Sequence, residues 1–178
     1  MSFESLGLPA ALARAVADSG YTQPTDVQLR AIPPAMVGSD LRVSSSTGSG
    51  KTAAFVLPAL SRVLAARGDA SKRRDNKTVH GPRVLVLTPT RELAMQVAKA
   101  TDSYGRHIPG LRVATIVGGV PYHAQLKALR GPLDVLIATP GRLMDHMANG
   151  KAVLANVEML VLDEADRMLD MGFIDDIN

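Results

Sequence analysis

Apolar residues occur along the chain in short unbroken runs, separated by stretches in which apolar and polar residues mix. The runs are rich in Val, Ile and Leu and show no strict alternation with polar residues, so they predict strands buried on both faces. Such strands are typical of a parallel sheet covered by helices. We predict strands at 83–87, 112–117, 134–138 and 159–162, and helices between them at 91–104, 122–129 and 143–147.

The N-terminal third of the chain predicts further helices and one more strand. Leu8, Leu12 and Val16 repeat at helical spacing in an Ala-rich stretch, which predicts a helix over 8–19 closed by Gly20. The pattern as a whole indicates an α/β fold, a mainly parallel sheet with helices on both faces, whose ligands bind at the carboxyl ends of the strands. The remaining expected elements are a helix over about 24–37 that Pro33 and Pro34 bend or restart, a strand at 41–43 and a helix over 51–67.

Composition fits one globular domain. Of the 178 residues, 46% are hydrophobic and only 3% aromatic, so we expect an aliphatic core. The absence of Cys excludes disulfides and thiolate metal sites, and the net charge of +3 mildly favours polyanionic partners. The chain starts without a secretory signal, and its longest apolar run, 53–60, is too short to span a membrane. We therefore expect a cytoplasmic protein without membrane association.

Residues 67–82 form a polar, net basic segment with almost nothing to bury. This composition predicts a mobile loop between two structured parts of the domain. The loop either adds a contact to a polyanion or is a solvated connection, and the sequence favours the second.

The strongest chemical signal is the stretch 44–52, Ser-Ser-Ser-Thr-Gly-Ser-Gly-Lys-Thr. It lies between a predicted strand and a predicted helix, as a phosphate-binding loop does, and its small residues let backbone N–H groups converge on phosphate oxygens. In this interpretation Lys51 reaches the β- and γ-phosphates, and the Thr52 hydroxyl binds Mg²⁺. The alternative is a Gly/Ser-rich surface turn, since Ser45 stands where the general pattern has Gly.

A second signal follows the last predicted strand, where Asp163 and Glu164 come directly after four apolar residues. Asp163 is the expected Mg²⁺ partner, partly through water, and Glu164 the candidate base that orients and deprotonates an attacking water. Acids in a first helical turn can also serve the helix dipole alone. Together with 44–52, however, the pair indicates an NTPase.

Short motifs along the whole chain resemble those of the DEAD-box ATP-dependent RNA helicases, most closely the bacterial RhlE type. Residues 163–166 spell Asp-Glu-Ala-Asp, and 167–173 resembles the usual sequel. The resemblance implies a RecA-like P-loop NTPase fold, with residues 1–178 as the N-terminal RecA-like ATP-binding domain. The other motifs follow in the family's order: a Q motif at 20–28, motif I at 45–52, motif Ia at 89–94, a glycine doublet at 118–119 and motif Ib at 139–142.

The resemblance implies ATP and Mg²⁺ as cofactors. Gln28 would bond the adenine edge through its amide, helped by Phe3 and Tyr21; without the family, Gln28 would be taken for an exposed helix residue. Lys51, Asp163 and Glu164 would be the catalytic residues, and Thr52 and Asp163 the metal partners. The phosphate-binding residues would be Ser46, Thr47, Gly48, Ser49, Gly50, Lys51 and Thr52.

RNA is the implied partner, held by its sugar-phosphate backbone without sequence specificity. Glycines allow close approach to the backbone, while hydroxyls, N–H groups and arginines bond phosphate oxygens. We assign Leu93 and Met95 instead to the core, and a simple turn is the alternative for Gly118. The implied RNA-binding residues are Pro89, Thr90, Arg91, Gly118, Gly119, Thr139, Pro140, Gly141 and Arg142.

The four histidines, at 80, 107, 123 and 146, have no acidic or Cys companions at ligand spacing. We expect surface or loop positions for them rather than a metal site.

The chain departs from the family pattern in several places. Ser45-Ser46 stand where motif I has Ala-Gln, and Asp26-Val27 stand where the Q motif has Pro-Ile, but neither change removes a ligand. Motif III and the second RecA-like domain are absent from the 178 residues. Omitting the motif III strand would leave sheet edges open, so self-association is a possible consequence.

The sequence thus predicts the ATP-binding core of an RNA helicase that remodels short duplexes, with the second RecA-like domain as its partner. For the isolated chain we expect weak nucleotide binding and little turnover. A nucleotide- and RNA-binding module without turnover stays open as the alternative. An unrelated phosphate-loop kinase or transporter ATPase would not need the motifs at 20–28 and 139–142.

Overall fold

The computed structural model describes residues 8–20, 24, 26–36, 51–67, 82–118, 121–130, 133–149, 154, 157 and 159–163. The chain divides into two compact units, one of Met1–Arg73 with Lys99–Gly110 and one of Arg74–Ala98 with Leu111–Asn178. The predicted strand at 41–43, most of the phosphate-binding stretch and the basic loop at 68–81 lie outside the described residues.

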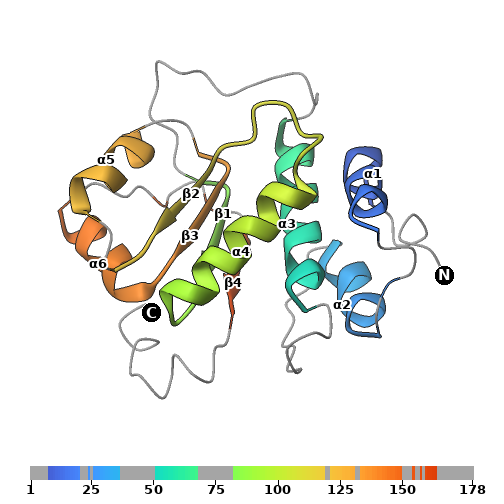
Figure 1. The fold of residues 1–178 in the computed structure, drawn as a ribbon, viewed down its shortest axis with the longest axis horizontal. Helices are drawn as coiled ribbons and strands as arrows, with labels where there is room; N and C mark the ends of the chain where they lie inside the picture. The colour runs from blue at the N-terminus through green and yellow to red at the C-terminus, as the bar shows by residue number, and fades with distance from the viewer. Residues whose placement is uncertain are drawn as a thin grey trace. The chain divides into compact units, whose positions relative to one another are not determined.

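The described residues of the first unit include the helices α1 (Ala10–Asp18), α2 (Asp26–Met36) and α3 (Lys51–Arg67). Both α1 and α2 pack against α3, and Figure 1 shows the three side by side. The buried face of α1 carries Leu12 and Val16, two of the residues whose spacing predicted the helix. Gly20 follows with φ of 85°, a left-handed conformation that Gly adopts readily and that commonly ends helices.

The two prolines of α2 do not restart the helix. Pro33 and Pro34 both lie inside the single element Asp26–Met36, next to the buried Ala31 and Ile32. Each proline removes one backbone donor. Packing of an apolar face commonly outweighs such local costs in proteins, and α2 packs on α3.

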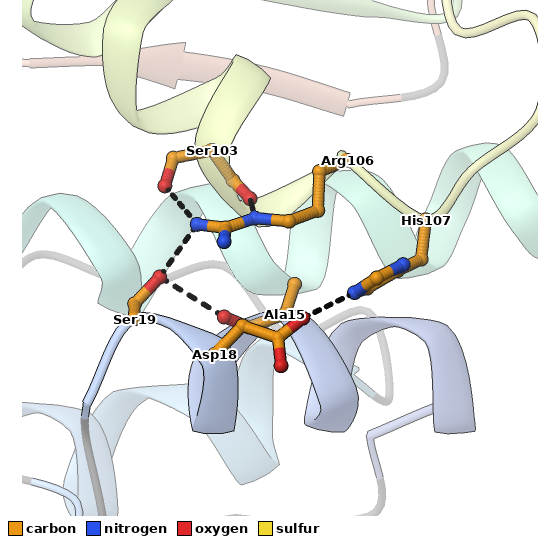
Figure 2. A network of polar contacts seen from close by, with 6 residues as sticks. All are labelled: Ala15, Asp18, Ser19, Ser103, Arg106 and His107. Carbon is orange, nitrogen blue, oxygen red and sulfur yellow. Dashed lines mark hydrogen bonds and ion pairs between the residues drawn. The ribbon is translucent and has the colours of Figure 1, made fainter.

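A polar network joins the end of α1 to the turn that follows α4 (Arg91–Tyr104) (Figure 2). The Arg106 guanidinium donates to the hydroxyls of Ser19 at 2.9 Å and Ser103 at 2.8 Å, and His107 pairs with Asp18. The Ser19 hydroxyl in turn donates to the Ala15 carbonyl at 2.9 Å. His107 lies in a turn, one of the positions expected for the histidines, and its acidic partner is 89 positions away in the chain.

The second unit is built on a parallel sheet with strand order β2-β3-β1-β4. From β1 the chain passes over the position of β3 to form β2. It then turns back, forms β3 between β2 and β1, and passes over β1 to form β4. All four strands lie at or within one residue of their predicted bounds. They are β1 (Val84–Leu87), β2 (Val113–Ile116), β3 (Val135–Ala138) and β4 (Met159–Leu162).

Helices lie on both sides of this sheet, as predicted. Since parallel crossovers are right-handed, the reversal after β2 places α4 on one side and the two later helices on the other, which is the arrangement in Figure 1. The later helices are α5 (Tyr122–Arg130) and α6 (Pro140–Ala148). The core on their side is aliphatic and consists of Leu85, Leu87, Ala114, Ile116, Leu129, Leu133, Leu136, Ala138 and Leu143.

Two predictions for this unit need correction. Helix α6 begins at Pro140 rather than at 143, because proline has no donor to lose at the first helical position and its fixed φ suits the helix. Strand β4 is not buried on both faces, since Leu160 and Leu162 are 51% and 37% exposed. It is the last strand in the order of the described sheet and pairs only with β1 there.

Among the described residues, no helix is long and apolar enough to cross a membrane.

Candidate functional site

The residues that follow the four strands lie together, because the strands are parallel and their carboxyl ends are on the same side of the sheet. This side is called the carboxyl edge of the sheet below. Three backbone hydrogen bonds extend the sheet one residue beyond its strands. The Thr88 N–H donates to Ala138 O at 3.0 Å, the Thr139 N–H to Ile116 O at 3.0 Å and the Asp163 N–H to Leu87 O at 2.9 Å. Thr88, Thr139 and Asp163, which stand just before motif Ia or at the first residue of motif Ib and of the acidic motif, are thereby held at one edge.

The first of these segments opens helix α4. The Thr90 hydroxyl accepts from the Leu93 N–H at 3.2 Å, as a helix cap does, and the Thr88 hydroxyl donates to the Thr90 carbonyl at 3.1 Å. Thr88 and Pro89 are buried, whereas Arg91 is exposed. Thr90 and Arg91 are thus fixed at a helix N-terminus, where backbone N–H groups and the helix dipole favour an anion.

The second segment opens helix α6. Thr139 is the capping residue, and its carbonyl accepts from the Leu143 N–H at 3.1 Å. Pro140 is buried and Gly141 is exposed, and a Cβ added at Gly141 would meet nothing within 4 Å. A second helix N-terminus therefore lies at the same edge as the first, with Arg142 in its first turn.

Arg142 is held by a buried network that the sequence analysis missed. Its Nη1 donates to Gln125 Oε1 at 3.2 Å, and the same oxygen lies 2.9 Å from His146 Nε2. Gln125 and His146 are 3% and 0% exposed, so the prediction that His146 lies on the surface or in a loop is wrong. Burial lowers the pKa of His146 below its usual value, the positive charge of Arg142 lowers it further, and the Asp145 carboxylate opposes both.

The residues assigned to ATP and Mg²⁺ are described only in part. Lys51 and Thr52 are the first two residues of α3. Gln28 is 4% exposed, which corrects the family-independent assignment of an exposed helix residue. Phe3, Tyr21, Glu164 and the loop residues Ser46, Thr47, Gly48, Ser49 and Gly50 lie outside the described residues, as does Gly119.

Asp163 directly follows β4, and 7% of its surface is exposed. Its carboxylate and the Thr52 hydroxyl are hard oxygen donors of the kind that Mg²⁺ takes while keeping several waters, so the two residues fit the ion chemically. Within the described residues no group of three or more His, Cys, Asp or Glu side chains could hold a metal.

The prediction that Met95 belongs to the core is wrong, because its side chain is 49% exposed.

Comparison with known proteins identifies the family to which a chain with this fold and these motifs belongs. The profile of the DEAD/DEAH box helicase family matches residues 25–178. The chain belongs to that family, and its parallel α/β sheet is consistent with the RecA-like domain of such helicases.

Individual relatives support the assignment over nearly the whole chain. The DEAD-box ATP-dependent RNA helicase 52A of Oryza sativa subsp. japonica is 47% identical over 175 residues, which are 96% of this chain and 29% of the relative. The ATP-dependent RNA helicase DeaD of Escherichia coli K12 is 43% identical over 99% of this chain and 26% of its own. The probable ATP-dependent RNA helicase ddx27 of Dictyostelium discoideum is 47% identical over 99% and 22%.

The chain spans about a quarter of the length of these curated relatives. The relatives carry several different names, so the narrower resemblance to the RhlE type stays a prediction.

Proposed function

We propose that the full-length protein is an ATP-dependent RNA helicase, and that this chain supplies its ATP-binding core. The observation that carries the proposal is the shared edge of the sheet. There the Asp163 backbone is bonded to β1, whose following segment opens α4 at Thr90, while β3 runs into α6 and Arg142. One acidic residue of the NTPase motif is thus built into the same sheet edge as two helix N-termini suited to phosphates.

The residues would act as follows. Lys51 and the loop before it would bind the phosphates of ATP, Thr52 and Asp163 would hold Mg²⁺, partly through water, and Glu164 would orient the attacking water. Mg²⁺ would neutralise charge that develops on the phosphates. Gln28 would select adenine, because an amide offers both a donor and an acceptor.

RNA would bind through its backbone at Pro89, Thr90, Arg91, Gly118, Gly119, Thr139, Pro140, Gly141 and Arg142. Such contacts bond phosphate and sugar rather than base edges, so they carry little sequence information. The proposal includes a second RecA-like domain of the same protein as the partner that closes over ATP and RNA, and a cytoplasmic location.

The test is RNA-stimulated ATP hydrolysis and unwinding of a short duplex by the full-length protein and three variants. Lys51→Ala should abolish ATP binding, whereas Glu164→Gln should bind ATP and lose hydrolysis by at least about a hundredfold, as expected for a general base. Lys99→Ala, an exposed lysine of α4, should behave as the wild type.

The outcomes also separate the alternative function. A wild-type protein that binds ATP and RNA without turnover would be a binding module rather than a helicase. Normal hydrolysis in Glu164→Gln would remove that residue from the role of the base.

A further inference from the structure

The Gln125 side chain bonds both to the residue that follows β2 and to helix α6. From α5, its amide nitrogen donates to the Val117 carbonyl at 2.9 Å, directly before Gly118. Its amide oxygen receives Arg142 Nη1 at 3.2 Å and His146 Nε2 at 2.9 Å. The two segments proposed to touch RNA, one after β2 and one at the start of α6, are therefore joined through a single amide.

The chemistry of the partners fixes the orientation of that amide. The Val117 carbonyl can only accept, so the amide nitrogen must face it, and the amide oxygen must face Arg142. A guanidinium can only donate, so the reversed amide would bring two donors together. Because the oxygen also faces His146 Nε2, that nitrogen carries the proton, and the whole chain of bonds has one consistent assignment.

Burial makes this arrangement difficult to replace. Gln125 is 3% exposed and His146 is 0% exposed, so water does not readily take over a lost partner. A buried polar group left without its partner costs considerably more than an exposed one. The orientation of Gln125 is thus held from three sides, and Gln125 in turn holds Arg142.

We propose that Gln125 is a positioning residue that presents the Arg142 guanidinium to the RNA backbone and sets its spacing from the segment after β2. The inference rests on the proposed RNA-binding function. A guanidinium has five N–H donors in a rigid fork, so the bond to Gln125, together with the 3.9 Å ion pair between Arg142 Nε and Asp145, is compatible with pairing a phosphate. Because the long Arg142 side chain is already held before RNA binds, less of its conformational entropy is lost on binding.

A double-mutant cycle on the full-length protein tests the inference. The probe is a fluorescein-labelled oligouridylate of about ten nucleotides, in the range that single-strand-binding folds cover. Gln125→Met keeps the size of the side chain and removes all three bonds. It should weaken oligouridylate binding about three- to tenfold in the wild-type background, a typical range for coupled contacts, and cause no further loss in Arg142→Ala.

Two further variants distinguish positioning from packing. Leu129→Val shortens a buried core side chain of the same helix. Its effect on oligouridylate affinity should be equal in the wild type and in Arg142→Ala. Gln125→Glu keeps an oxygen for Arg142 and His146, so it should bind oligouridylate more tightly than Gln125→Met. A packing role predicts the reverse order, because Met buries no charge. Should Gln125→Met not fold, Gln125→Leu, which also removes all three bonds, replaces it in the cycle, and its effect must disappear with Arg142→Ala.

The outcomes separate this inference from the function on which it rests. Wild-type protein that does not bind oligouridylate would overturn the proposed function and the inference together. Wild-type protein that binds, combined with additive losses in Gln125→Met and Arg142→Ala, would overturn only the inference.

Discussion

At the residue scale, a histidine in the core couples stability to pH. His146 is the only polar residue among the largest fully buried side chains of the described chain. Desolvation and the adjacent Arg142 both lower its pKa, and the Asp145 carboxylate opposes them only in part. Neutral imidazole is therefore part of the folded state.

This burial predicts loss of stability in mild acid. Because the pKa of His146 is lower in the folded protein than its ordinary value of 6.5, the unfolded chain binds more protons as the pH falls below that value. The contribution is complete above about pH 6.5 and is lost as the pH falls toward the folded-state pKa. Urea unfolding at a series of pH values should show a smaller decrease of the free energy of unfolding in His146→Gln than in the wild type.

The matched control is His123→Gln, which removes an exposed histidine of α5 and should keep the wild-type pH dependence. If the wild type and His146→Gln lose stability equally between pH 7.5 and 5.5, a pH window chosen around the ordinary histidine pKa, the buried imidazole is not the cause.

At the element scale, two glycines at helix ends should respond in opposite directions to the same substitution. Gly20 follows α1 with φ of 85°, so Gly20→Ala forces a side chain into the left-handed region and should cost about 1 kcal/mol of stability. Gly141 lies within α6 with open space around its Cα, so Gly141→Ala should leave stability unchanged or raise it by about 0.5 kcal/mol.

Thermal unfolding of both alanine variants measures this difference. Gly20→Asn supplies the control, because Asn tolerates the left-handed region better than Ala and should recover part of the loss. Equal destabilisation by the two alanine variants would mean that helix length or solvation, and not the backbone angle, decides the cost.

The elements themselves could largely be predicted from the sequence, because their signals are local. Four apolar residues in β1 and in β3 are buried on both faces, and this environment is what selects an unbroken apolar run. Helix α6 begins three residues before the apolar pattern predicts, because Pro140 suits the first helical position although it is not part of that pattern. The exposure of Leu160 and Leu162 depends on what covers β4, which no local pattern reports.

The site could be predicted only where its motifs are contiguous. Thr90, Arg91 and Arg142 were identified from short motifs, and the structure places them at one sheet edge. Gln125 and His146 were missed because their bonds join residues 17 to 21 positions apart. A weak signal existed, since Gln125 lies four residues before the buried Leu129 and therefore on the same face of α5. A polar residue on an apolar helix face often has a buried hydrogen-bonding partner.

At the scale of the whole molecule, charge placement matters more than charge amount. The net charge of +3 is only a mild bias toward polyanions. Arg91 and Arg142 follow β1 and β3 at the carboxyl edge, whereas the exposed Arg112 directly precedes β2 at the amino edge. Only the first two should contribute to RNA binding.

Salt dependence of RNA binding by the full-length protein tests this placement. Each phosphate contact to a single strand contributes about 0.7 to the slope of log affinity against log salt, because binding releases counterions. Arg91→Gln and Arg142→Gln should each lower the slope by about that amount and weaken oligouridylate and oligoadenylate binding alike, since backbone contacts do not distinguish bases. Arg112→Gln should leave the slope unchanged. An equal decrease of the slope in Arg112→Gln would mean that RNA binding depends on overall charge. The carboxyl edge would then not be the binding surface.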